Sequence, residues 1–115
     1  MASYDVVQLA ELHGIVKKVR KALGVTAFGV NYFELPPGAE GREHDETESN
    51  QEEVYVYVKG SGRLHIDDEE IEVREGMAIR IEPSVTRQPV AGDDGLSWVA
   101  IGAPREGKYE PPSWG

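Results

Sequence analysis

Residues 53–67, EVYVYVKGSGRLHID, contain two stretches in which apolar side chains alternate with polar or aromatic ones, separated by Gly60-Ser61-Gly62. An alternation with a period of two predicts a β-strand, because successive side chains of a strand point to opposite faces of the sheet. A short glycine-bounded segment between two such stretches predicts a hairpin turn. We therefore expect antiparallel pairing on both sides of residues 60–62 and a fold built from strands.

The same pattern continues along most of the chain. We expect strands at residues 27–35, 53–59, 63–67, 70–74, 77–82, 86–91 and 96–103. The 13 glycines and 7 prolines fall between these segments instead of collecting in one linker, which is typical of an all-β domain. Seven short strands within about eighty residues predict a sandwich or barrel that spans residues 27–104.

The two ends of the chain lie outside this pattern. Residues 1–26 have a brief helical spacing of apolar side chains between Gly14 and Gly24, which predicts a short helix or an irregular N-terminal arm. Residues 105–115 contain two prolines and no period, so they predict an extended tail. Tyr109 and Trp114 are the side chains that could anchor this tail.

The composition narrows the classes of function. A chain of 115 residues with 39% hydrophobic content fits one globular domain. Its 12 basic and 21 acidic residues give a net charge of −9, which repels phosphate backbones and argues against nucleic-acid binding. The absence of cysteine excludes disulfides, thiolate metal sites and cysteine nucleophiles. No apolar run approaches the roughly 20 residues of a membrane span, and the first residues lack a signal-peptide pattern, so we expect a cytoplasmic protein without a membrane partner.

The two faces of the strand at residues 53–59 both carry bulky side chains. Glu53, Tyr55 and Tyr57 share one face, and Val54, Val56 and Val58 share the other. One face should line the interior of the barrel, and the other should be covered by the terminal arm or by a second copy of the chain, which predicts a homodimer. If the tyrosines point inward, the Glu53 carboxylate lies at the mouth of a cavity. If the valines point inward, Glu53 faces water.

Residues 36–60, PPGAEGREHDETESNQEEVYVYVKG, resemble the first motif of the cupin family, and residues 76–90, GMAIRIEPSVTRQPV, resemble the second. The resemblance implies a small single-domain cupin, which is a jelly-roll β-barrel or double-stranded β-helix. Family members typically hold one divalent metal through two histidines and a glutamate of the first motif and a histidine of the second. The resemblance therefore implies a metal or ligand site where the two motifs meet.

The motifs of this chain depart from the family pattern at two positions. His44 takes the place of the first histidine and Glu53 that of the glutamate, but Glu46 stands where the second histidine would be. Arg87 stands in the place of the second-motif histidine. An arginine cannot be a metal ligand, because its guanidinium stays charged and offers only donors. Arg87 can instead replace the charge of the ion by pairing with the carboxylates.

Three functions remain open at this point. In the first, a pocket lined by His44, Glu53, Tyr55, Tyr57 and Arg87 binds a small polar or anionic molecule without a cofactor. In the second, His44, Glu46 and Glu53 hold Zn, Mn, Fe or Ni in an enzyme of the dioxygenase or isomerase type. In the third, the glutamates and Arg87 satisfy one another in a ligand-free structural or regulatory dimer. The sequence has no Gly-x-Ser-x-Gly or phosphate-binding loop, and it assigns no catalytic residue.

Overall fold

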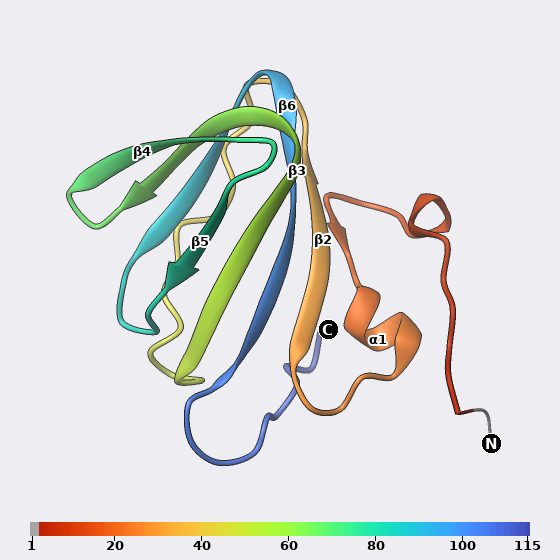
Figure 1. Ribbon diagram of the computed structural model, residues 1–115. Helices are drawn as coiled ribbons and strands as arrows, with labels where there is room; N and C mark the ends of the chain where they lie inside the picture. Colours follow the sequence, from red (N-terminus) through yellow and green to blue (C-terminus); the bar gives the residue numbers. More distant parts are fainter. Residues whose placement is uncertain (1–2) are drawn as a thin grey trace.

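The computed structural model describes residues 3–115, and its regular structure is almost entirely β (Figure 1). The elements are η1 (Leu9–Glu11), β1 (Val16–Lys17), α1 (Val19–Leu23), β2 (Gly29–Leu35), β3 (Gln51–Ile66), β4 (Glu69–Arg74), β5 (Ala78–Ile81) and β6 (Arg87–Pro104). The all-β prediction is confirmed, and the helix expected within the N-terminal arm is the short α1. None of the helices within residues 3–115 has the length and apolar character needed to cross a membrane.

The strands form one antiparallel sheet that curls into a jelly-roll barrel (Figure 1). The order along the sheet is β1-β2-β6-β3-β4, and β5 pairs with the first half of β3. The long strands β3 and β6 pair with each other at both ends of the barrel. Glu53 lies in the first of these two pairing regions, between β5 and β6, whereas Arg87 begins β6 in the second, opposite Ile66.

The predicted hairpin turn at residues 60–62 is wrong. β3 runs unbroken from Gln51 to Ile66, and the chain reverses only at Asp67 and Asp68. Gly60 adopts a φ of +80°, and a Cβ at Gly60 would collide with the carbonyl oxygen of Gly95. The glycines therefore allow two curved strands to approach closely, because a side chain would not fit between them.

The predicted break at residues 92–95 is wrong for the same reason. β6 passes through this segment and continues to Pro104. The pairing of β3 with β6 jumps here from Gly60 opposite Leu96 to Gly62 opposite Ala91, so the extra residues form a bulge in β6. The two longest strands of the barrel thus bend together at one glycine-rich corner.

The tyrosine face of β3 points into the barrel. Tyr55 and Tyr57 are buried, and both rings lie next to Trp98, which also stacks on Phe33 with ring centroids 4.9 Å apart. Val58 on the opposite face is 39% exposed. The alternative with the valines inside is therefore wrong, and Glu53 follows the tyrosines to the inner side.

The tail runs back along the N-terminal part of the sheet. Tyr109 is buried, as predicted, but Trp114 is 52% exposed, so its predicted anchoring role is wrong. The carbonyl oxygen of Gly115 instead accepts a hydrogen bond from Nε of Arg20 in α1. The tail is therefore fixed by one aromatic side chain and by its last residue.

Candidate functional site

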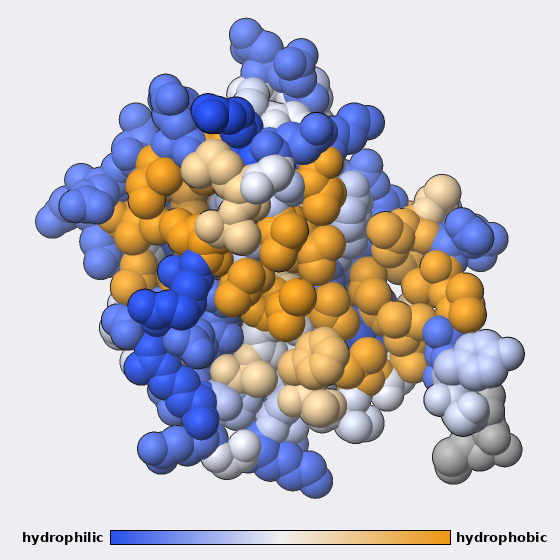
Figure 2. All heavy atoms as spheres, in the orientation of Figure 1, coloured by the Kyte–Doolittle hydropathy of each residue, from blue (hydrophilic) through white to orange (hydrophobic). Residues whose placement is uncertain are grey.

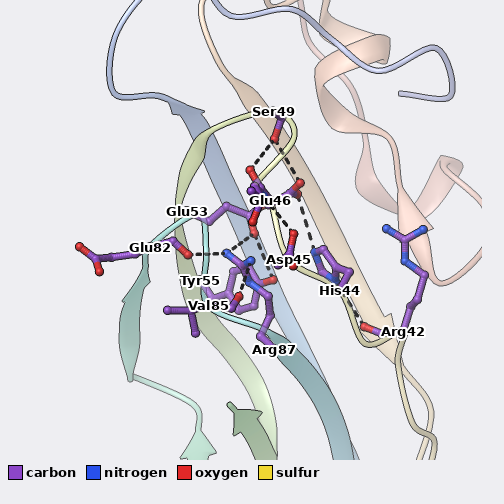
Figure 3. A network of polar contacts seen from close by, with 11 residues as sticks. Arg42, His44, Asp45, Glu46, Ser49, Glu53, Tyr55, Glu82, Val85 and Arg87 are labelled. Carbon is purple, nitrogen blue, oxygen red and sulfur yellow. Dashed lines mark hydrogen bonds and ion pairs between the residues drawn. The ribbon is translucent and has the colours of Figure 1, made fainter.

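The candidate site lies where the connection between β2 and β3 crosses the start of β6. His44 and Arg87 exchange two backbone hydrogen bonds, with N···O distances of 3.0 and 2.9 Å. The backbone N–H of Glu46 donates to the carbonyl oxygen of Pro83 at 2.8 Å. These bonds hold the connection against the barrel, and they bring His44 and Glu46 next to Glu53 of β3 (Figure 3).

Three side chains at this point could hold one ion. One potential ligand atom from each of His44, Glu46 and Glu53 lies within 4.8 Å of the others. Nε2 of His44 is 3.7 Å from Oε1 of Glu46, and Nδ1 is 3.4 Å from the carbonyl oxygen of Arg42. Burial lowers the pKa of His44, which favours the neutral ring. A ring that donates from Nδ1 to Arg42 presents the lone pair of Nε2 to the site.

Glu53 is the most buried of the three, with a side chain that is 12% exposed. Burial, and after it the nearby charge of Glu46, raises the pKa of Glu53 to about 7. Arg87 and the hydroxyl of Tyr55 lower the pKa and keep it from rising above this value. Two negative charges on Glu46 and Glu53 are therefore unfavourable at neutral pH, and either a proton or a bound cation would relieve their repulsion.

Arg87 lies behind Glu53 and is fully buried. Its Nη2 is 3.3 Å from Oε1 of Glu53, and its Nη1 donates to the carbonyl oxygen of Val85 at 2.9 Å. Nη2 also lies 3.5 Å from the carbonyl oxygen of Glu82, whereas Nε has no hydrogen-bond partner among residues 3–115. The guanidinium is thus directed at protein groups, and it acts as an internal counterion of Glu53.

The two tyrosines of the predicted pocket occupy different depths. The Tyr55 hydroxyl donates to Oε1 of Glu53 at 3.4 Å, which places it at the site itself. The Tyr57 hydroxyl is buried without a hydrogen-bond partner within the described chain, and its ring lies beside Trp98. Burial raises the pKa of both phenols, so both keep their protons at neutral pH. The structure therefore groups Tyr55 with His44, Glu53 and Arg87, and it places Tyr57 farther inside the core.

A network of ion pairs beside the site was missed by sequence reasoning. Arg80 and Arg105 both pair with Glu52 and with Glu82, at distances between 2.8 and 3.7 Å. A surface hollow of about 190 Å³ adjoins it, lined by Thr47, Asn50, Glu82, Pro83, Ser84 and Arg105. The alternation along β5 would have predicted Arg80 and Glu82 on the same face of the sheet. No local signal in the sequence connects these two residues with Arg105 in the tail.

Comparisons with known proteins agree with this architecture. A model of the cupin domain family matches residues 31–102, which is more than half of the chain. A cupin protein from Bacteroides fragilis is 28% identical, with a TM-score of 0.81 over 99% of this chain and 94% of that one. A search of the curated proteins returned no match.

Two more distant structures share the fold. An uncharacterized protein with a double-stranded β-helix domain from Klebsiella pneumoniae is 15% identical, with a TM-score of 0.72 over 92% of this chain and 97% of that one. A predicted oxalate decarboxylase from Thermotoga maritima is 16% identical, with a TM-score of 0.70 over 86% of this chain and 98% of that one. At these identities the likeness concerns the barrel alone.

Proposed function

This chain belongs to the cupin family, and from that premise we propose that it binds a divalent metal ion through His44, Glu46 and Glu53 and admits a small polar molecule at the barrel mouth. The observation that carries the proposal is the convergence of an imidazole and two carboxylates, with donor atoms within 4.8 Å of one another. Nitrogen and oxygen donors of this kind suit Zn, Mn, Fe and Ni.

The surroundings of the three residues fit such an ion. The contact between Nδ1 of His44 and the carbonyl of Arg42 is the kind of supporting hydrogen bond that orients metal-bound histidines. A cation would also relieve the repulsion between Glu46 and Glu53. When bound, a divalent cation polarises an oxygen of a substrate or lowers the pKa of a bound water.

The remaining residues of the site have supporting parts in this proposal. Arg87 and Tyr55 both contact Oε1 of Glu53, so they fix the orientation of this carboxylate and leave Oε2 for the ion. The oxygenase and isomerase classes are the activities to assay once a metal has been identified.

A second candidate is a metal-free pocket for a small polar molecule. The observation that favours it is the buried ion pair between Arg87 and Glu53, 3.3 Å apart, in which a guanidinium already supplies the positive charge. In this version His44, Glu46 and Tyr55 provide hydrogen bonds at the mouth. Because Arg87 is fully buried, its part is to balance Glu53 and not to contact the ligand.

Metal content and thermal stability test the first candidate. We expect untagged protein to carry near-stoichiometric metal, and the metal-free protein to be stabilised by Mn²⁺, Fe²⁺, Ni²⁺ or Zn²⁺. At 100 times the dissociation constant the gain is about 2.7 kcal/mol, or roughly 10 °C in melting temperature.

Two single variants make this test specific. His44→Ala should erase the metal-induced shift. His65→Ala is the matched control, because His65 is a partly exposed histidine of β3 that pairs with Glu70 and not with the site. Protein without metal, and without a shift from any of the four ions, would contradict the metal proposal and leave the metal-free pocket.

A further inference from the structure

The tail, residues 105–115, is held to the barrel at two points. Tyr109 and Gly115 are buried, whereas the other residues of the tail are exposed. The carbonyl oxygen of Gly115 accepts a hydrogen bond from Nε of Arg20, and Nη1 of the same guanidinium donates to the carbonyl oxygen of Val25 at 2.9 Å. In Figure 1 the tail returns from the end of β6 toward β2 and α1. Because it is attached at these two points and exposed between them, we call residues 105–115 the strap.

Tyr109 is seated on the inner face of the sheet, in line with the candidate site. Gly29 of β2 pairs with Gly102 of β6, which in turn pairs with Glu53 of β3, so these three positions face the same side of the sheet. A Cβ at Gly29 would lie 2.9 Å from the Tyr109 hydroxyl, so the phenol occupies the space of a side chain at this position. The main chains of Gly29 and Glu53 are two strand spacings apart, or about 10 Å. The phenol therefore lies across the barrel mouth from Glu53.

The charges around the phenol connect it with the same site. Burial raises the pKa of Tyr109, Arg20 acts against this increase, and Glu46 adds to it. The phenol is thus within electrostatic range of the residue that fixes the strap and of one residue of the candidate metal group. It keeps its proton at neutral pH, and a phenol hydroxyl can donate a hydrogen bond to an oxygen of a ligand.

The position of the strap is not explained by apolar area alone. Val30 of β2, Ile101 of β6 and Val54 of β3 form an apolar row on the outer face of the sheet. Figure 2 shows hydrophobic surface that extends across these strands toward the N-terminal segment. Ile101 is nevertheless 38% exposed, so the strap leaves it open to solvent. The shape of the inner face, with a glycine where the phenol is seated, therefore directs the strap to the mouth.

We propose that the strap is one wall of the ligand site, and that the Tyr109 phenol closes the β2 side of the mouth opposite Glu46 and Glu53. The inference rests on the proposed function, because it concerns access to the same site. With the strap seated, the mouth admits only a molecule that fits between the phenol and the two carboxylates. A larger molecule must first displace the strap, which is held by few contacts.

Modification of histidine by diethyl pyrocarbonate tests this wall in the metal-free full chain. The reagent attacks a neutral imidazole nitrogen, and Nε2 of His44 lies in the mouth, 3.7 Å from Oε1 of Glu46. We expect Tyr109→Ala to accelerate the modification of His44 at least about tenfold, because the buried ring is the main apolar contact of the strap. His13 and His65 lie outside the site, so their rates should not change. Mass spectrometry of the peptides measures all three rates.

Two further variants make the test specific. Trp114→Ala is the matched control, because Trp114 is an aromatic side chain of the same strap that is 52% exposed, and this variant should react like the parent. Gly29→Val is a second way to displace the strap, since the valine side chain takes the space of the phenol while Tyr109 itself is kept. Circular dichroism melting curves identify the variants that fold. An unchanged rate at His44 in folded Tyr109→Ala or Gly29→Val would overturn the inference, as would an equal acceleration in Trp114→Ala.

The same proteins separate this inference from the metal proposal. If the parent binds Ni²⁺, its release to a chelator should also be faster in Tyr109→Ala, and equal release rates would overturn the inference. A parent that binds none of the four ions would refute the metal proposal. The histidine modification uses no metal, so it decides in that case too whether the strap closes the mouth.

Discussion

Substitution of Arg87 by methionine tests the role of the buried counterion. Arg87→Met keeps a long side chain in the core but removes the positive charge 3.3 Å from Oε1 of Glu53 and the donor to the carbonyl of Val85. Removal of one partner of a buried ion pair costs about 3–5 kcal/mol when the other remains charged. Loss of a hydrogen bond alone costs about 1 kcal/mol. We therefore expect a cost near 4 kcal/mol at pH 8.

The cost should depend on pH because Glu53 can take up a proton. Its pKa is about 7 in the folded protein, against an ordinary value of 4.5. At pH 5 the carboxyl group is already neutral in the folded state, so Arg87→Met should lose only the hydrogen bonds, or about 2 kcal/mol. The difference between the two pH values is therefore about 2 kcal/mol.

Urea denaturation of the metal-free proteins at pH 5 and pH 8 measures both numbers. Arg87→Met in the Glu53→Gln background is the control, because this background has no carboxylate to strand, and its cost should be the same at both pH values. An equal cost of Arg87→Met at pH 5 and pH 8 in the parent protein would refute the counterion argument. So would a cost below about 1 kcal/mol at pH 8, since a mere surface contact could account for it.

Two further predictions concern Glu53 and the glycine corner. The raised pKa of Glu53 gives a contribution to stability that is complete below pH 4.5 and is lost as pH rises through about 7. The metal-free parent should therefore lose about 3 kcal/mol of stability relative to Glu53→Gln between pH 4.5 and 8. Stability curves that run parallel for the two proteins would contradict this. Gly60→Ala should cost roughly 2–4 kcal/mol, because it adds a collision with Gly95 to a positive φ. Gly107→Ala, with a similar φ of +82° and open space around the Cβ position, should cost only about 1 kcal/mol in the same denaturation assay.

The sequence predicted the strands well and the corners poorly. Alternation is a local signal, so it located β2, β4 and β5 within a few residues. The glycines at residues 60–62 have the same local appearance as turn glycines. Their actual role depends on the backbone of β6, which approaches from more than thirty residues away in the chain. A single sequence gives no sign of this approach between distant segments.

The same limit applies to the candidate site. Motif spacing alone brought His44, Glu53 and Arg87 together in the prediction, and the structure has them in mutual contact range. Whether the guanidinium faces the mouth or lies behind Glu53 depends on how the start of β6 is packed. The pairs of Arg80 and Arg105 with Glu52 and Glu82 join β3 and β5 to the residues that follow β5 and β6, so no short pattern could reveal them.

The backbone pairing of His44 with Arg87 separates the position of the site from its chemistry. The two hydrogen bonds between these residues use only main-chain atoms, so they require no particular side chain at either position. A substitution at residue 87 can therefore change the charge beside Glu53 while the loop that carries His44 stays attached to β6. The main chain thus holds residue 87 beside Glu53 whichever side chain it carries, which makes this position the natural starting point for redesign of the site.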